Sequence, residues 1–137
     1  MVPDDIRALS DYFYDNGDVG ECLASGSFQT DGMIVVPCSM KTLAGIHSGY
    51  SSSLLLRACD VTIKEQRRLV LVARESPLSP IHLRNMYELS QMGVMIVPPM
   101  MHYYSNSDSL ESWTHQFAQR VLGYFGLATE PYEWQGL

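Results

Sequence analysis

The chain has 137 residues, of which 46% are hydrophobic and 18% are charged, the composition of an ordinary globular domain rather than a disordered segment. Its net charge of −6 has the wrong sign for a nucleic-acid-binding surface. No apolar run approaches the ~18 residues of a membrane span, and the N-terminus lacks the basic and apolar stretches of a signal peptide. We therefore expect a cytoplasmic protein that binds neither nucleic acid nor membrane.

The cysteines and histidines show no pattern typical of disulfides or of a metal centre. The three cysteines lack CxxC spacing, and the four histidines are scattered along the chain. We predict free thiols and no metal. The residues concerned are Cys22, Cys38 and Cys59, with His47, His82, His102 and His115.

Acidic residues are concentrated at the start of the chain. Residues 1–21 carry six acids and one base, whereas residues 22–137 carry nine acids and eight bases, enough cations for a local anion pocket. We expect one domain over residues 1–137, with a poorly matching segment at 1–23, an α/β core at 24–127 and an arm at 128–137. Within the first segment, residues 7–14 suit a short helix that ends at Asn16 and Gly17.

From residue 24 onward, short apolar runs alternate with longer helical patterns. The runs at 33–36, 68–73 and 93–97 read as buried strands, and Pro37 and Pro98 end the first and the third. Helical patterns cover residues 42–49, 53–66, 79–92 and 109–125. This order predicts a parallel sheet with right-handed crossovers.

Two of these helices have clear start signals. Ser79 and Pro80 supply a capping residue followed by proline at the first helical position. Residues 107–109 supply Ser and Asp caps for the last helix, with Glu111 in its first turn.

The first candidate site is the turn of residues 37–42, which follows the first predicted strand and opens a helix. Ligands of open α/β sheets bind at this edge, where hydroxyls of Ser39 and Thr42 and unpaired amides suit an anion. A simple helix cap explains the same residues equally well.

Charged and aromatic residues supply three further candidates. Arg57 and the run 64–68 can be an anion site, or a solvated helix end. Arg74 and Glu75, after the second strand, can bind a phosphate and move protons, or form a surface ion pair. Tyr103 and Tyr104 after the third strand, together with Arg120 in the last helix, can be functional or structural.

Taken in order, these segments resemble the flavin prenyltransferases, the UbiX-like proteins formerly called phenylacrylic acid decarboxylases. The resemblance covers about residues 24–136 and continues through Gly93, Pro98, Tyr104, Arg120 and Trp134. The motifs that carry it are Cys38-Ser39-x-x-Thr42-Leu43-x-x-Ile46, Arg57-Ala58-x-Asp60-Val61-x-x-Lys64-Glu65, Leu69-Val70-Leu71-Val72-x-Arg74-Glu75-x-Pro77-Leu78 and Ile81-His82-Leu83-x-Asn85-Met86.

The resemblance implies a flavodoxin-like Rossmann fold, a three-layer sandwich around a parallel sheet, assembled as a homo-oligomer, usually a dodecamer. It implies transfer of a dimethylallyl group from dimethylallyl phosphate to reduced FMN, without a metal. The prenylated FMN then serves a UbiD-type decarboxylase of aromatic acids. Relative to that family, the chain is expected to be N-terminally shortened and to lack the usual first strand and Gly-rich turn.

The resemblance also implies roles for individual residues. Glu75 would relay protons, and residues 25–27 would lie near the flavin as a loop. The implied FMN-binding residues are Ser39, Met40, Lys41, Thr42 and, from a neighbouring subunit, Arg74, and those for the phosphate of the prenyl donor are Lys64, Tyr104, Arg120 and Arg57.

Two alternatives to a prenyltransferase stay open. One is a non-catalytic, oligomer-forming or regulatory relative without a working flavin site. The other is a flavodoxin-like electron carrier. It is disfavoured because a redox carrier has no need of a separate phosphate pocket, which is what the residues Lys64, Arg74, Glu75, Tyr104 and Arg120 indicate.

Overall fold

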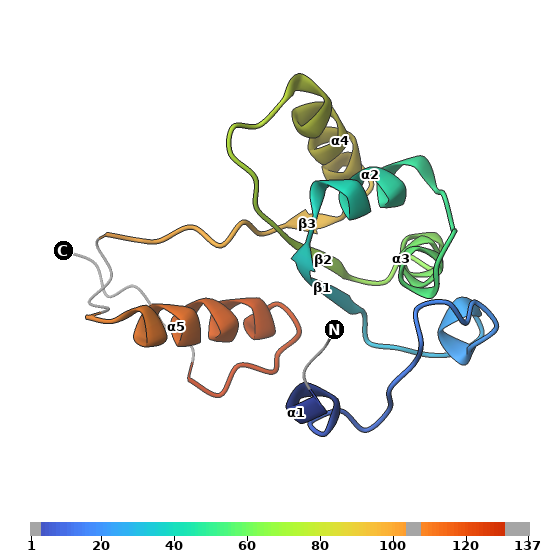
Figure 1. Cartoon of the computed structure of the whole chain (residues 1–137), viewed down its shortest axis with the longest axis horizontal. Coiled ribbons are helices and arrows are strands. Elements are labelled where there is room, and N and C mark those ends of the chain that lie inside the picture. The colour runs from blue at the N-terminus through green and yellow to red at the C-terminus, as the bar shows by residue number, and fades with distance from the viewer. Residues whose placement is uncertain (1–3, 104–107, 131–137) are drawn as a thin grey trace.

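A computed structural model describes residues 4–103 and 108–130. Within them, three parallel strands form one sheet in the order β1 (Met33–Cys38), β2 (Leu69–Ala73) and β3 (Met95–Ile96), with helices on both faces (Figure 1). The predicted α/β class and the parallel sheet are confirmed.

β2 is the centre of this sheet. All five of its residues are buried, because it pairs with a strand on each side and is covered by helices on both faces. This double burial explains why its sequence is apolar throughout instead of alternating.

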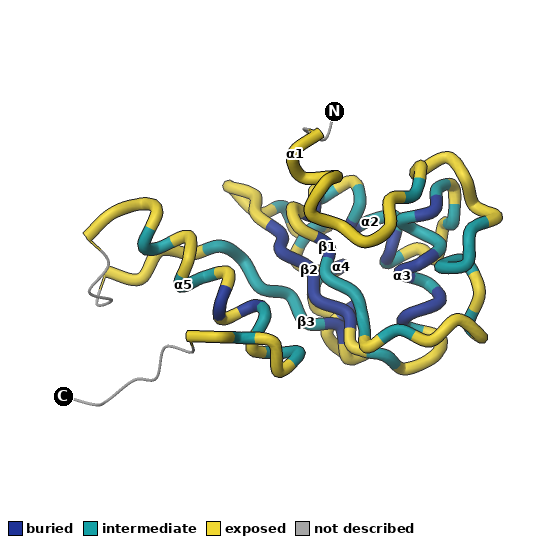
Figure 2. Tube along the Cα trace, turned by 90° about the horizontal axis from the view of Figure 1, so that it is seen from below, coloured by how far each residue is buried: buried dark blue, intermediate teal, exposed yellow. Residues whose placement is uncertain are grey.

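Three helices cover one face of the sheet: α2 (Met40–Ser48), α3 (Leu54–Lys64) and α4 (Pro80–Gln91). The opposite face is covered by α5 (Leu110–Gly123), through Phe117 and Val121 against Val70 and Val72 of β2. Figure 2 shows buried residues along the strands and the helix faces turned to them. The core of the first face is formed by Val35, Cys38, Leu43, Ile46, Cys59, Leu69, Leu71, Ala73, Leu89 and Val94.

The structure corrects the ends of two predicted strands. β1 does not stop at Pro37 but continues to Cys38, because a bulge between Val35 and Cys38 takes the proline, which has no N–H, out of the ladder. β3 begins only at Met95, because Gly93 has φ +86° and serves as the left-handed turn that ends α4.

Both predicted helix starts are confirmed. The Ser79 hydroxyl accepts the His82 N–H at 3.1 Å, and His82 Nδ1 accepts the Ser79 N–H at 3.2 Å, a reciprocal capping box. At α5, Ser109 accepts the Ser112 N–H at 3.1 Å.

The predicted helix at 7–14 is wrong. The helix in this segment, α1 (Asp4–Arg7), ends where the prediction begins, and the Ser10 hydroxyl donates to the Arg7 carbonyl at 2.8 Å as the chain leaves it. The segment then runs to a 3-10 turn, η1 (Cys22–Ala24), and crosses the start of α3 on the way. There Asn16 accepts the Leu54 N–H through its carbonyl at 2.9 Å and the Leu55 N–H through its side chain at 3.0 Å.

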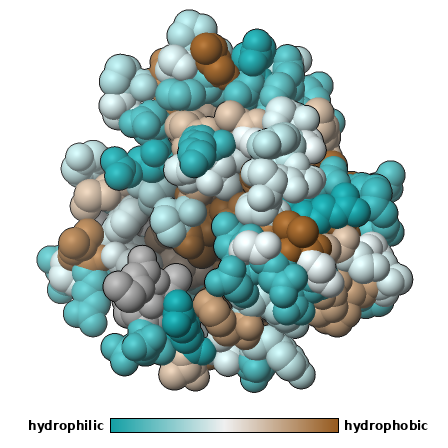
Figure 3. All heavy atoms as spheres, turned by 45° about the vertical axis from the view of Figure 1, so that its right-hand side comes forward, coloured by the Kyte–Doolittle hydropathy of each residue, from teal (hydrophilic) through white to brown (hydrophobic). Residues whose placement is uncertain are grey.

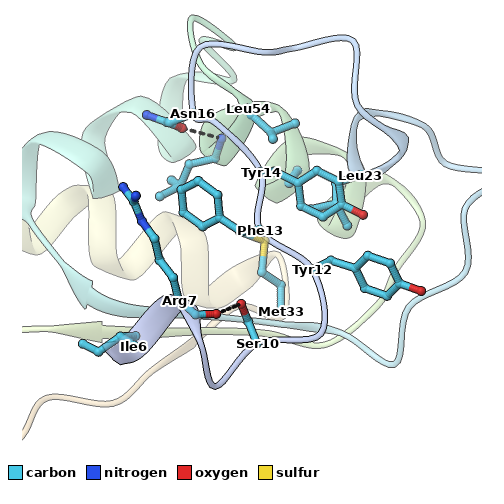
Figure 4. Close-up of a pocket in the computed structure, with 12 residues that line it drawn as sticks. Ile6, Arg7, Ser10, Tyr12, Phe13, Tyr14, Asn16, Leu23, Met33 and Leu54 are labelled. Carbon is cyan, nitrogen blue, oxygen red and sulfur yellow. Dashed lines mark hydrogen bonds between the residues drawn. The ribbon is translucent and has the colours of Figure 1, made fainter. Parts of the chain in front are cut away.

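A cavity of about 450 Å³ lies between this N-terminal segment and α3 (Figure 4). Phe13 and Leu23 face Leu54 and Met33 across it, so its lining is largely apolar. None of the site residues predicted from the sequence lines this cavity.

All three cysteines are free thiols, as predicted. Among the described residues, no group of three or more His, Cys, Asp or Glu side chains is placed to hold a metal ion. No helix in the described part of the chain is long and apolar enough to cross a membrane.

Candidate functional site

The turn at residues 37–42 lies at the C-terminal edge of the sheet, where β1 passes directly into α2. Ser39 has extended backbone angles and caps α2, and its hydroxyl accepts the Thr42 N–H at 3.1 Å and lies 3.0 Å from the Thr42 hydroxyl. The helix-cap interpretation is therefore correct as geometry. Because the Ser39 cap accepts only the Thr42 N–H, the first amides of α2, on Met40 and Lys41, have no partners inside the helix. Such amides can bind an anion.

Arg74 and Glu75 follow β2 at the same edge, and both are exposed. They do not form the surface ion pair that the sequence left open, since Glu75 instead accepts the N–H of Ser76 at 3.0 Å. Within the described ranges, the Arg74 guanidinium makes neither an ion pair nor a hydrogen bond. Among the described residues it is therefore an unpaired cation beside the start of α2.

Cys38 lies beneath this edge and is buried. Burial raises the pKa of its thiol to about 11, so the group is neutral near pH 7. The reactive polar groups at this edge are therefore hydroxyls, amides, a guanidinium and a carboxylate, and not a thiolate.

Lys64 and Arg57 lie elsewhere. Both are on α3, seven residues apart and so on the same helical face about 10 Å from each other, and Lys64 ends the helix before β2 begins. Arg57 donates to Asp60 at 2.8 Å, and the Lys64 ammonium is bonded to the Glu65 carboxylate. Since β2 spans about 16 Å, Lys64 belongs to the opposite edge of the sheet from Arg74, whereas Arg57 lies about 10 Å farther back along α3.

The loop of residues 25–27 lies with Lys64 and not with the α2 turn. Its Ser25 and Ser27 hydroxyls are 2.8 Å apart, and Gly26 lies against the side chains of Lys64 and Glu65. Hydrogen bonding to Lys64, and next its positive charge, lower the pKa of Glu65.

The remaining predicted residues fall outside these two clusters. Arg120 is exposed on α5, and its guanidinium Nε donates to the Tyr124 hydroxyl at 3.3 Å. Tyr104 and Trp134 lie outside the described residues, whereas Tyr103 is 95% exposed.

The structure thus brings together Ser39, Met40, Lys41, Thr42, Arg74 and Glu75 at one edge, and Lys64 with the 25–27 loop at the other. Arg57 is not brought to Lys64, because it lies about 10 Å from it along α3. The sequence analysis included Arg67 in the charged run 64–68 but missed that it binds the loop that contacts Lys64. Nothing in the spacing could reveal this, because the partners are about 40 residues apart and meet only in the fold.

A parallel α/β sheet with a capped helix start at its C-terminal edge is typical of nucleotide- and flavin-binding proteins. The family model described as Flavoprotein matches residues 16–117, which is most of the chain.

Curated relatives and solved structures narrow this class. A probable UbiX-like flavin prenyltransferase from Escherichia coli O157:H7 is 53% identical over 135 residues, which are 97% of this chain and 68% of that protein. The crystal structure of the dodecameric FMN-dependent UbiX-like decarboxylase from E. coli O157:H7 superposes with a TM-score of 0.94 at 50% identity, over 99% of this chain and 74% of that one.

A third match is the structure of AnUbiX (PadA1) in complex with FMN and dimethylallyl pyrophosphate. Its TM-score is 0.95 at 50% identity, and the match covers 100% of this chain and 73% of that one. The chain belongs to the UbiX-like flavin prenyltransferases, whose three-layer flavodoxin-like fold it shares. The match to relatives reaches into residues 1–23, farther than the sequence motifs alone indicated.

The donor set at the C-terminal edge fits a flavin nucleotide. Free amides and two hydroxyls stand at the start of α2, and Arg74 has no competing partner among the described side chains. An anionic phosphate or the carbonyl oxygens of a flavin ring can satisfy these donors together.

Proposed function

We propose that this chain is a flavin prenyltransferase, which transfers a dimethylallyl group from dimethylallyl phosphate to reduced FMN. The observation that carries the proposal is Arg74, which has no partner in the described part of the chain and lies beside the capped start of α2 at the C-terminal sheet edge. A structural neighbour at 50% identity binds FMN and dimethylallyl pyrophosphate, which supports both the cofactor and the kind of donor.

In this proposal the α2 turn and Arg74 bind FMN, with Arg74 acting within its own subunit and not from a neighbouring one as the resemblance implied. The amides of Met40 and Lys41 donate to its oxygens, and so does one of the Ser39 and Thr42 hydroxyls, since the other donates within the Ser39–Thr42 pair; Arg74 adds a fixed positive charge. Reduced FMN supplies, when bound, the ring atoms N5 and C6 that take the prenyl group. The protein contributes orientation, which for such a transfer is a large part of the catalysis.

Lys64, Arg57, Arg120 and Tyr104 hold the phosphate of the prenyl donor. Breaking the bond between carbon and phosphate oxygen leaves negative charge on the phosphate, so cations and a phenol around it stabilise its departure. Three of these four residues are of the cationic types that bind phosphate in proteins.

Glu75 holds or moves a proton as the new ring closes. Its carboxylate is exposed at the FMN edge and is fixed at one oxygen by the Ser76 N–H, so the other oxygen can accept a proton. Lys64 takes part in the same step by stabilising the leaving phosphate.

We further infer that the active site is shared between subunits. Lys64 and Glu75 of one chain belong to opposite edges of the sheet, so a single chain cannot place both at one prenyl donor. In a homo-oligomer, the Lys64 edge of one subunit can lie against the Glu75 edge of another, so that both residues reach one prenyl donor. We propose a dodecamer, the assembly of the structural neighbour.

The proposed location is the cytoplasm, and the proposed recipient of the product is a UbiD-type decarboxylase. A prenylated flavin is a diffusible cofactor with no further chemistry in this chain, so a second enzyme must use it.

Two measurements test the proposal. FMN added to the purified protein should shift its absorption spectrum on binding, and reduced FMN with dimethylallyl phosphate, or with the pyrophosphate, should give a flavin heavier by one prenyl group. Glu75→Gln should keep FMN and lose the product. A protein that stays colourless under excess FMN would contradict the proposal and favour the non-catalytic alternative.

A further inference from the structure

The end of α3 and the 25–28 loop form a bonded unit at the Lys64 edge of the sheet. The Arg67 guanidinium donates to the carbonyls of Gly26 at 2.7 Å and of Phe28 at 2.8 Å. The Glu65 carboxylate, which bonds the Lys64 ammonium, lies against Gly26 of the same loop. Residues 64, 65 and 67 therefore enclose the loop from one short stretch of chain.

Gly26 is the point where the two halves of this unit meet. A β carbon on Gly26 would lie 2.8 Å from the Glu65 carboxyl carbon and 2.9 Å from Lys64 Nζ, both closer than normal contact. The backbone of Gly26 is not in the left-handed region, so its conformation is open to alanine. Glycine is needed here for the space that the Lys64–Glu65 pair occupies.

Arg67 is itself held in place by the way that α3 ends. Gln66 adopts a left-handed conformation at φ 54°, and the Arg67 N–H returns to the Thr62 carbonyl at 2.9 Å. This turn directs the guanidinium back to the loop, where its planar fork spans two carbonyls. A lysine at the same position offers a single point charge and cannot reproduce the fork.

The ion pair with Glu65 leaves Lys64 able to bind the phosphate of the prenyl donor as well. An ammonium group has three N–H donors, and with one of them bonded to Glu65 two remain for a phosphate. The hydrogen bond from Lys64 lowers the pKa of Glu65, which stays ionised and keeps its hold on the ammonium.

We propose that Arg67 and Gly26 are positioning residues for Lys64. Arg67 fixes the 25–28 loop, and Gly26 in that loop leaves the space in which Glu65 holds the Lys64 ammonium toward the phosphate of the donor. This inference rests on the proposed function for the role of Lys64, and otherwise on the contacts of the described residues.

Gly26→Ala is the sharpest test. Its β carbon would displace the ends of two flexible side chains and no backbone, so the melting temperature should change little. We expect dimethylallyl phosphate, measured by calorimetry on the FMN-loaded protein, to bind about tenfold more weakly, the loss of one charge-assisted hydrogen bond. FMN affinity should be unchanged.

Gly123→Ala is the matched control, because a β carbon there meets only the Ala128 side chain at an ordinary 3.7 Å. Arg67→Lys should weaken donor binding like Gly26→Ala, and the double variant should lose little more than either single one, since both act through Lys64. Wild-type donor affinity in Gly26→Ala or in Arg67→Lys would overturn the inference for that residue.

A crystal structure of Gly26→Ala separates this inference from the proposed function. If the wild-type protein binds no dimethylallyl phosphate, the proposed function fails, and the structure still decides the positioning role. Separation of the Lys64 ammonium from Glu65 in the variant supports the role, and an unmoved pair overturns it.

Discussion

At the scale of single residues, Arg74 shows how an absent contact can indicate function. An exposed guanidinium with no partner among the described residues adds nothing to the stability of one chain, yet it stands beside the free amides of α2. The cation is therefore available to a ligand.

Arg74→Ala should weaken FMN binding about ten- to hundredfold, the range for a lost hydrogen bond to a charged group, and leave the melting temperature unchanged. Spectroscopic titration with FMN measures the first and thermal unfolding the second. Arg7→Ala is the control, because Arg7 pairs with Asp4 at 3.7 Å and lies over the Phe13 ring in the N-terminal segment. Equal FMN affinity in the two variants would remove Arg74 from the site.

The three thiols should differ sharply in reactivity. Burial raises the pKa of Cys59 to about 12, with a smaller effect from Cys38, and raises that of Cys38 to about 11, so both remain protonated and unreactive at pH 8. Cys22 is only half-buried. A chromogenic disulfide reagent should label one thiol rapidly in the folded protein and all three in denaturant, and rapid labelling of Cys59 at pH 8 would contradict the burial argument.

At the scale of elements, the sequence predicted those strands and helix starts that depend only on residues close together in the chain. The run Leu69 to Val72 indicated a strand because it is apolar on both faces, and Ser79 with Pro80 indicated a helix start through its own hydroxyl. The bulge at Pro37 was missed because it depends on register with β2, a contact between distant parts of the chain.

Ser79→Ala should lower the free energy of unfolding by about 1 kcal/mol, since it removes the acceptor for the His82 N–H and one half of the capping box. Ser90→Ala in the same helix should change it by less than about 0.5 kcal/mol, because the exposed Ser90 hydroxyl only donates to the Tyr87 carbonyl one turn back. Urea unfolding of both variants makes the comparison. If Ser90→Ala lowered the free energy of unfolding as much as Ser79→Ala, the loss at Ser79 could not be assigned to the helix cap.

At the scale of the whole molecule, the single chain leaves much apolar surface uncovered. Brown, apolar side chains reach the surface of the face drawn in Figure 3. Leu9 is 87% exposed, and Val36 on β1 is 65% exposed. Surfaces of this kind are typical of proteins that associate.

The candidate site is divided between the two edges of the sheet because of the direction in which β2 runs. Helix α3 ends at the edge where β2 begins, and Glu75 lies beyond the edge where β2 ends, so no rotation of side chains unites Lys64 with Glu75. The sequence could place each residue at the end of an element. It could not show which subunit supplies it, because contacts between chains leave no spacing in one chain.

Mixed oligomers test this division directly. Lys64→Ala and Glu75→Gln should each abolish prenyl transfer, but co-assembled subunits of both kinds should regain about a quarter of wild-type activity, since random pairing of neighbours leaves that share of sites with both residues intact. Differently tagged subunits, co-expressed and purified through both tags, provide the sample. The control mixes Lys64→Ala with the Lys64→Ala, Glu75→Gln double variant, in which no site can carry both residues. Activity in neither mixture, from oligomers of wild-type size, would show that one chain supplies both groups.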